Sequence, residues 1–217
     1  MRRLPERARY DRETIERILD EGFICHVGFC GPDGPEVVPT AYARVGDVLY
    51  LHGAAGNHML RSVGAGGAVC LVVTLVDGLV LARSTFHHSI DYRSVVVYGC
   101  GEEVRDPGEK RAALDAIVEQ IVPGRTAEAR GPSARELRST RVVRVQIDEV
   151  AAKVRVGGPN DDEEDVARGG VWAGVLPLST VPGAAVPDGS ASSLPPVPAY
   201  VSDYRRPVAG GEPPATS

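Results

Sequence analysis

The first 156 residues alternate between hydrophobic and polar positions in a way that predicts a mainly β protein. Apolar stretches of strand length lie at 23–29, 36–44, 47–52, 68–76, 78–82 and 93–104, and residues 141–156 alternate as a last long strand. Turn signals separate the early stretches, namely GPDG at 31–34 and the pair Val45-Gly46. We therefore expect six or seven antiparallel strands in a small Greek-key barrel, a split β-barrel in form.

Helical spacing and capping residues mark four further segments. They are 10–22, 57–63, 106–122 and a short helix after Ser133. Asp11 is a candidate N-cap for the first of these helices, and Asp106 with Pro107 begins the third. Ser133 and Glu136 have the spacing of a capping box. The expected fold is mainly β with flanking helices.

The character of the chain changes after residue 156. GGPNDDEED at 157–165 reads as an acidic loop, and from Pro177 onward proline, glycine, serine and alanine dominate. Apolar residues such as Trp172 nevertheless continue through this region. We expect a barrel domain at 1–156, an extended C-terminal arm at 157–204 that packs on the barrel or on a partner subunit, and a disordered tail at 205–217.

Composition and charge narrow the classes of function. The 217 residues carry a formal net charge of −5 without a dense basic tract, so no nucleic-acid partner is expected. The longest apolar stretch, 68–76, is too short to span a membrane, and the N-terminus lacks the apolar region of a signal peptide. We therefore expect a cytoplasmic protein without a membrane partner. The four cysteines form no Cys-x-x-Cys pair and are expected to be free.

The glycine-rich stretch GAAGNHMLR at 53–61 is a candidate phosphate site. It leads from a strand into a helix that Asn57 can cap, and the amides of a helix start carry partial positive charge. His58 and Arg61 lie three residues apart on one helix face, so both can reach the same anion. The lysine and hydroxyl residue of a P-loop are absent. An ordinary glycine-rich connection ahead of a capped helix is the alternative.

A second cluster of polar residues lies at the mouth of an apolar strand, in FHHSIDYRSVVVYG at 86–99. His87, His88 and Asp91 are chemically suited to a metal, but adjacent histidines on an extended chain point to opposite faces. His88 and Asp91 alone would be two ligands, so no metal site is predicted. Arg93 and Ser94 supply a cation and a hydroxyl for the rim of a ligand site.

The longer segment LVDGLVLARSTFHHSIDYRSVVVYG at 75–99 resembles the pyridoxamine 5'-phosphate oxidase-like, FMN-binding split-barrel family. Within that family it is most similar to the branch that includes nitroimidazole-resistance proteins. VVPTAY at 37–42, the strand ending LYLHG at 49–53 and VWAGVLPL at 171–178 follow in the order of that branch. The resemblance covers about residues 10–203 and implies a homodimeric split barrel with FMN in a cleft between the subunits.

The resemblance also implies roles for individual residues. Those expected to line the isoalloxazine are Val38, Pro39, Thr40 and Tyr42. Those expected around the ribityl phosphate are His52, Gly53, Asn57, His58 and Arg61. Those expected to approach the flavin from the next strand, or to close the site, are Tyr92, Arg93, Ser94 and Trp172. Such proteins often have Ser-Arg or a lysine after the glycine-rich loop, whereas this chain has Asn57-His58, which weakens the phosphate site because histidine is only partly charged at neutral pH.

The expected function is that of an FMN-dependent oxidoreductase. A reduced nicotinamide, NADH or NADPH, would reduce the flavin, which would then reduce a small nitroaromatic- or quinone-like molecule. His88 is the candidate catalytic residue, because it lies an even number of residues from Tyr92 and Ser94 and shares their face of an extended chain. One alternative is a non-catalytic protein that binds flavin or haem, with His87 or His88 as the single haem ligand. Another is a split barrel without flavin that serves other small-molecule chemistry.

Overall fold

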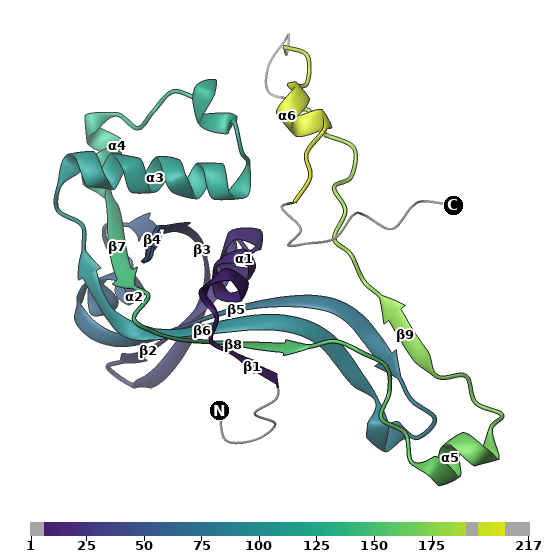
Figure 1. Ribbon diagram of the computed structural model, residues 1–217. Coiled ribbons are helices and arrows are strands. Elements are labelled where there is room, and N and C mark those ends of the chain that lie inside the picture. The colour runs from purple at the N-terminus through teal and green to yellow at the C-terminus, as the bar shows by residue number, and fades with distance from the viewer. Residues whose placement is uncertain (1–6, 190–194, 207–217) are drawn as a thin grey trace.

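The structure is a computed structural model that describes residues 7–189 and 195–206 (Figure 1). Its strands are β1 (Ala8–Arg9), β2 (Ile24–Gly31), β3 (Gly34–Val45), β4 (Val48–Ala54), β5 (Ala65–Leu81), β6 (Ser89–Glu103), β7 (Thr140–Gln146), β8 (Glu149–Arg155) and β9 (Gly174–Pro177). Its helices are α1 (Arg12–Glu21), α2 (His58–Gly64), α3 (Pro107–Ile121), α4 (Ala134–Ser139), α5 (Glu163–Arg168) and α6 (Ala199–Ser202), with 3-10 turns η2 (Thr85–His87) and η3 (Arg125–Ala127). None of the helices described is long and apolar enough to cross a membrane.

Six antiparallel strands close into a barrel, which confirms the predicted fold class. β2 pairs with β3, β3 with β4, β4 with β7, β7 with β6, β6 with β5, and β5 returns to β2. Three more strands lie outside this closed ring, because β8 adds to β6, β1 to β8 and β9 to β5. Closure leaves few unpaired backbone groups at the barrel's edges, which is how small β proteins avoid open edges.

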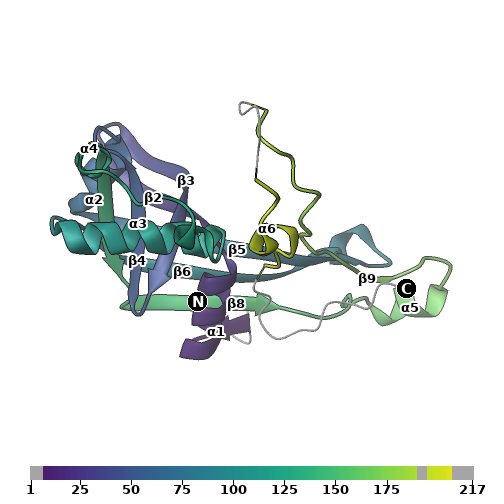
Figure 2. The ribbon, with the colours of Figure 1, turned by 90° about the horizontal axis from the view of Figure 1, so that it is seen from above.

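The interior of the barrel is filled by apolar side chains that alternate along the strands. Val27, Leu49 and Val95 are fully buried members of this core. Helix α1 contributes Ile18 and Leu19 to the same cluster, so it covers one opening of the barrel. Helix α3 packs across β3, β4 and β7 on another side (Figures 1 and 2).

The predicted helix caps are confirmed. The Asp11 carboxylate accepts a hydrogen bond from the backbone N–H of Thr14 at 2.9 Å, and Asp106 caps α3 in the same way. Ser133 and Glu136 form the full capping box at α4. Each such cap contributes about 1 kcal/mol to its helix by satisfying amides that the helix leaves unpaired.

The two strands predicted on either side of Asp77 are one continuous strand, β5. The predicted division into two strands is wrong, because pairing with β6 continues through Asp77 with a register shift between Val76 and Gly78. A bulge of this kind adds a residue without ending the strand. Here it directs the Asp77 carboxylate to Arg93 of β6. A Cβ on Gly78 would lie 3.2 Å from the carbonyl oxygen of Leu176, so the glycine also lets β9 approach.

The last long strand predicted at 141–156 is two strands, β7 and β8. Both pair with β6, but at different parts of it: β7 pairs with the end of β6 at 101–103 and with β4, whereas β8 pairs with β6 at 92–98 and does not pair with β4. Between them, the backbone N–H of Ile147 donates to the carbonyl oxygen of Asp47 at 2.8 Å. With β8 and with β1 and β9, which are only two and four residues long, the described sheet has nine strands, of which six form the barrel as predicted.

Beyond the barrel, β5 and β6 extend as a long hairpin, and we call its residues 76–92 the hairpin arm (Figures 1 and 2). β9 pairs with its β5 edge from Gly78 to Leu81, and α5 lies near its tip. Helix α5 falls within the stretch predicted as an acidic loop, and its acidic first turn suits a helix N-terminus. Part of the predicted C-terminal arm thus packs on its own chain. From residue 207, the predicted tail lies outside the described residues.

Candidate functional site

The predicted site residues fall in separate regions of the fold, and three of these regions have a cavity. His52 lines a cavity under α3, which we call the α3 cavity. Arg93 lines a cavity where the hairpin arm leaves the barrel, the junction cavity. His88 and Tyr92 line a cavity on the surface of the hairpin arm, the arm cavity. The residues expected around one flavin are therefore not gathered into a single pocket within one chain.

The α3 cavity has a volume of about 760 Å³, which lies within the range of small-molecule sites. Leu114 and Ile117 of α3 form its apolar side, and residues 125–132 form much of its rim. Burial lowers the pKa of His52, so its ring is neutral at pH 7. The Nδ1 atom of His52 is buried and has no hydrogen-bond partner. Such an atom is rare in a folded protein, and it is where a bound molecule gains a hydrogen bond.

The glycine-rich loop adopts the predicted cap at the start of α2. The Asn57 side-chain oxygen accepts a hydrogen bond from the backbone N–H of Leu60 at 2.9 Å. Gly53 lies directly against this helix, since a Cβ there would come within 3.0 Å of Leu60 Cδ1. Asn57 and Gly53 therefore shape the loop: the Asn57 side-chain oxygen is used by the helix cap, and Gly53 lets α2 pack closely against β4.

Two basic residues, His58 and Arg61, stand on α2, as the helical spacing predicts. The His58 side chain is half exposed, and its Nδ1 lies 3.8 Å from Oε1 of Glu36. Its ring also contacts Phe29, with 5.8 Å between the ring centroids. Arg61 is exposed, and no side chain of the described residues forms an ion pair or hydrogen bond with its guanidinium. Arg61 is thus the cation of this loop that is open to an anion.

The four β3 residues predicted to line a flavin ring differ in what they expose. Tyr42 is fully buried, and its hydroxyl donates to the carbonyl oxygen of Leu19 at 2.6 Å. Its predicted role does not fit this position, because the side chain ties α1 to the barrel and has no surface to offer a ring. Val38 packs partly against the core, Thr40 is half buried and Pro39 is exposed.

The arm cavity, of about 610 Å³, has a mostly apolar wall that includes Val76, Ile90 and Tyr92. The Nδ1 of His88 lies 2.9 Å from the carbonyl oxygen of Ser84. Because a carbonyl oxygen only accepts, Nδ1 carries the proton of the neutral ring and Nε2 keeps a lone pair. This arrangement suits a metal ligand. It differs from the predicted catalytic role, which requires a donor at the open side of the ring.

His87 is held by a different segment of the chain. Its Nε2 lies 3.2 Å from Oδ2 of Asp162. The neighbouring Asp161 accepts hydrogen bonds from the backbone N–H and the guanidinium of Arg83, at 2.8 and 2.7 Å. Burial raises the pKa of Asp161, but the hydrogen bonds from Arg83 lower it by more. The sequence pattern did not identify these aspartates as site residues. The signal that it offered was an acidic run, which is opposite in charge to the basic turn that the run meets in the fold.

Asp91, the other residue of the histidine cluster with metal-binding chemistry, is already engaged. It is buried, and its carboxylate accepts hydrogen bonds from Arg155 and from the backbone N–H of Gly157. Within residues 7–189 and 195–206, no group of three or more His, Cys, Asp or Glu is placed to hold a metal ion. Haem is a separate case, because one histidine suffices as its protein ligand.

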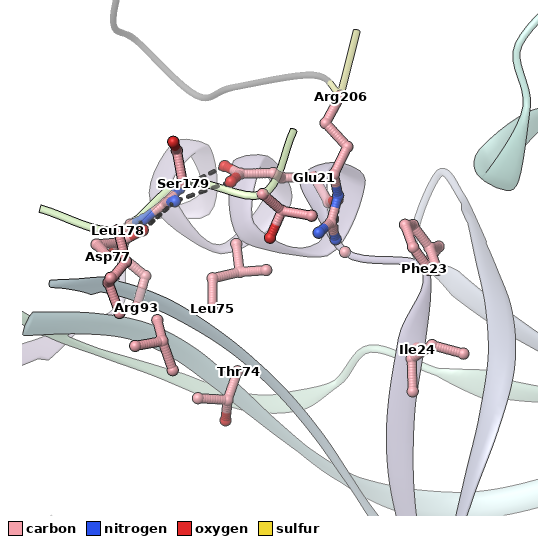
Figure 3. Close-up of a pocket in the computed structure, with 13 residues that line it drawn as sticks. Glu21, Phe23, Ile24, Thr74, Leu75, Asp77, Arg93, Leu178, Ser179 and Arg206 are labelled. Atoms are coloured by element: carbon pink, nitrogen blue, oxygen red, sulfur yellow. Dashed lines mark hydrogen bonds and ion pairs between the residues drawn. The ribbon is translucent and has the colours of Figure 1, made fainter. Parts of the chain in front are cut away.

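The junction cavity has a volume of about 380 Å³ and an ion-paired wall (Figure 3). Arg93 donates to Asp77 from Nε and Nη2, at 2.8 and 2.7 Å, and to Glu21 from Nη1 and Nη2, at 2.5 and 2.8 Å. The hydrogen bonds to Asp77 and Glu21 raise the pKa of Arg93. All three guanidinium nitrogens are engaged, so Arg93 joins α1 to the hairpin arm and is not open to a cofactor.

Arg206 is a second cation of the junction cavity. It lies in the stretch predicted from the sequence as a disordered tail. It lies above the cavity in Figure 3. Its Nη2 donates to the carbonyl oxygen of Glu21 at 3.1 Å, and its Cζ lies 4.4 Å from the centroid of the Phe23 ring. Its Nε is buried without a partner. No sequence pattern marks this residue, because the chain returns to the barrel only through tertiary contacts.

The last two predicted residues, Ser94 and Trp172, are not among the residues that line these three cavities. Ser94 is on β6, paired with Thr74 of β5 and Lys153 of β8. Trp172 is 68% exposed, and its ring lies over Gly174, where a Cβ would come within 2.9 Å of it. Its predicted role in closing a site stays a prediction.

Comparison with known proteins gives one family. The sequence profile of the family described as pyridoxamine 5'-phosphate oxidase matches residues 11–154. A search of curated proteins gives no match. Among solved structures, the flavocytochrome Anf3 from Azotobacter vinelandii is 36% identical to this chain. The matched region covers 94% of this chain and 95% of Anf3, and the two superimpose with a TM-score of 0.87.

Two further solved structures complete the comparison. The FAD and Heme binding protein from Mycobacterium smegmatis is 35% identical, covers 91% of this chain and 96% of its own length, and has a TM-score of 0.86. A protein described for 5-nitroimidazole antibiotic resistance, from Bacteroides thetaiotaomicron, is 28% identical and covers 68% of this chain and 86% of its own length, with a TM-score of 0.57. The match to the first two structures thus extends into the C-terminal region, whereas the third leaves about a third of this chain unmatched.

Proposed function

This chain belongs to the pyridoxamine 5'-phosphate oxidase family, a family of flavin-binding split barrels, and from that premise we propose that it is a redox protein that binds a flavin and, through His88, haem. The relatives that match more than nine-tenths of the chain are described as a flavocytochrome and as an FAD and Heme binding protein. Their likeness raises haem from an alternative in the sequence analysis to part of the proposal.

The observation that carries the haem proposal is the hydrogen bond between His88 and Ser84. It leaves the Nε2 lone pair of the neutral ring on the side open to a metal, beside the apolar wall of the arm cavity. Haem has an apolar macrocycle and needs one such nitrogen, so both the donor and the wall fit it. His87 does not compete for this role, because its ring pairs with Asp162.

Other residues support the flavin proposal. His52 offers a neutral ring with an unpartnered buried Nδ1 beside a cavity of about 760 Å³. Arg61 offers an exposed guanidinium for a phosphate, and His58 stands three residues before it on α2. We propose FAD ahead of FMN, since FAD is the flavin named for a relative that matches nearly the whole chain.

When bound, a flavin supplies hydride and electron transfer, and haem iron supplies one-electron and oxygen chemistry. The protein's own contribution is to position these groups. Ser84 keeps His88 in one tautomer, Asp162 holds the adjacent His87 aside, and Val76 and Ile90 present apolar surface to the arm cavity. We propose a nitroaromatic- or quinone-like acceptor and a reduced nicotinamide donor on the sequence resemblance alone.

We also propose a homodimer, because the hairpin arm leaves large apolar side chains in water. Val76, Leu79 and Ile90 are 50%, 39% and 46% exposed. Contiguous apolar surface of this kind is typical of an interface. A second copy covering the arm cavity would also shield the open side of His88 from solvent.

Absorbance of the purified protein tests the cofactor proposal. We expect flavin bands near the blue end of the spectrum together with an intense haem band, and mass spectrometry of the released flavin to identify FAD. Protein that is colourless as purified, and that takes up neither FAD nor haemin when they are added, would contradict the proposal. FMN in the extract would overturn only the choice of flavin.

A further inference from the structure

We propose that the junction cavity binds a small organic carboxylate through Arg206. None of the residues assigned above to flavin or haem supplies this cation. The site joins three parts of the chain that are far apart in sequence: the end of α1, the base of the hairpin arm and the C-terminal segment (Figure 3).

The charges of the cavity favour an anion at Arg206. Arg93 is enclosed by the carboxylates of Glu21 and Asp77, so its charge is already balanced by groups of the protein. Arg206, by contrast, has no carboxylate partner among the described residues, and its one hydrogen bond goes to the backbone carbonyl oxygen of Glu21. A ligand carboxylate at Arg206 would therefore supply a counter-charge at contact distance, which the protein does not.

The guanidinium of Arg206 is already held in position. It stacks on Phe23 and uses Nη2 on Glu21, while its Nε has no partner. Behind it, the Tyr204 hydroxyl donates to the carbonyl oxygen of Ile121 at 2.9 Å and fixes the C-terminal segment against α3. A cation that is ordered before binding loses little conformational freedom when an anion arrives. An unpaired N–H also costs free energy that an acceptor would recover.

The rest of the cavity indicates what else the ligand carries. Ile24, Leu75 and Leu178 provide apolar surface, and the hydroxyls of Thr74 and Thr180 provide hydrogen-bonding groups. With a volume of about 380 Å³, the cavity is near the lower end of small-molecule sites. A single carboxylate on a small hydrocarbon or aromatic body matches these walls.

The junction cavity also adjoins the arm cavity, because Thr74 and Val76 line both. The carboxylate has two possible sources for that reason. It belongs either to a free acid, which would then bind beside the surface that His88 faces, or to a propionate of haem bound at His88. The chemistry that Arg206 recognises is the same in both cases.

Calorimetric titration with benzoate tests the free-acid source, using benzamide as a neutral ligand of the same shape. Arg206→Gln removes the cation, and Arg205→Gln is the matched control, because among the described residues the Arg205 guanidinium donates only to the carbonyl of Tyr204 next to it. We expect benzoate to bind the wild type and Arg205→Gln alike, and Arg206→Gln at least tenfold more weakly. If Arg206→Gln fails to fold, Thr180→Val takes its place as the test variant. We expect Thr180→Val to weaken benzoate binding severalfold.

A second titration distinguishes the haem source. Protein prepared without haem is titrated with haemin and with haemin dimethyl ester, whose carboxylates are blocked. If a propionate occupies the cavity, Arg206→Gln weakens haemin at least tenfold and leaves the ester unchanged. Two results would overturn the proposal. In the first, wild type and Arg206→Gln have the same affinity for benzoate and also the same affinity for haemin. In the second, benzoate does not bind and the substitution leaves the affinity for haemin unchanged. The benzoate titration needs no cofactor, so its result stands even if the purified protein is colourless.

Discussion

The Nδ1 of His88 lies 2.9 Å from the carbonyl oxygen of Ser84, four residues earlier in the chain. The 3-10 turn η2 brings the two groups together, and it separates His88 from His87, whose ring meets Asp162. Two adjacent residues of the same type thus have different partners: one a backbone acceptor, the other a carboxylate. Only His88 keeps Nε2 open in a fixed tautomer.

We expect His88→Ala to remove the haem absorbance band, with at least about a tenfold loss of haem affinity, because the only proposed iron ligand is gone. His87→Ala is the matched control and should retain haem. Flavin content should be unchanged in both variants. Absorbance spectra of the two purified proteins check this, and equal haem content would rule out His88 as the ligand.

Arg61→Ala should weaken flavin binding by about 1.5–3 kcal/mol, the scale of a hydrogen bond to a charged group. Its effect on the unfolding free energy of the cofactor-free protein should stay within about 0.5 kcal/mol, because the side chain is exposed and unpaired. Arg105→Ala, which removes another exposed arginine, should change neither quantity. Fluorescence titration with the flavin measures the affinity. If Arg61→Ala binds the flavin as tightly as the wild type does, the flavin phosphate does not bind at α2.

His52 should make stability depend on pH below neutrality. Burial lowers its folded-state pKa below the ordinary value of 6.5, so the unfolded chain binds a proton more readily. The stability that the neutral, buried ring contributes is complete above about pH 6.5. It is lost as the pH falls below that value, because below it the unfolded state binds more protons than the folded state. Urea unfolding between pH 7 and pH 5 should show this slope in the wild type. His52→Gln should reduce the slope, whereas His26→Gln, at an exposed position, should keep it.

Arg93→Ala should lower the free energy of unfolding by about 2–3 kcal/mol. Removing the guanidinium takes away the cation that pairs with both the Glu21 and the Asp77 carboxylate, and breaking a fully buried ion pair costs about 3–5 kcal/mol. The smaller value reflects the 30% exposure of Asp77. Arg168→Ala, which breaks a local i,i+3 pair with Asp165 whose arginine is 74% exposed, should cost less than about 1 kcal/mol. Chemical denaturation compares the two, and equal losses would contradict the structural role of Arg93.

Light scattering should give twice the 23.0 kDa mass of one chain. Ile90→Glu places a charge on the apolar face of the hairpin arm and should shift the protein toward the monomer. Val166→Glu adds the same charge on α5, at a residue that is also exposed, and should leave the mass unchanged. A wild-type protein that is monomeric at micromolar concentration would disprove the proposed dimer.

Sequence alone was sufficient where the determining interactions are short in range. Asp11 caps a helix through an amide three residues away, and Ser133 and Glu136 close their box over the same distance. Strand alternation is equally local, since each residue points opposite to the one before it. These features established the fold class, and the segment at 75–99 indicated the family.

The pattern could not show where strands break or continue. Asp77-Gly78 has the composition of a turn, yet the pairing of β5 with β6 continues through it as a bulge. Conversely, the alternation of residues 141–156 hides a break between two strands, of which β7 pairs with β4 and the end of β6, and β8 with an earlier part of β6. In both cases the neighbouring strand decides, because hydrogen bonds between strands override the local preference of one or two residues.

The candidate sites depended still more on the tertiary structure. The sequence identified Arg93 as a cation and Tyr42 as an aromatic side chain, but only the fold enclosed the first between Glu21 and Asp77 and buried the second under α1. Arg206 meets Glu21 across 185 positions of the chain. Residue type and spacing therefore determined which chemistry this protein carries. Tertiary packing decided which of those groups are open to a ligand, because charge and burial depend on neighbours that sequence distance does not reveal.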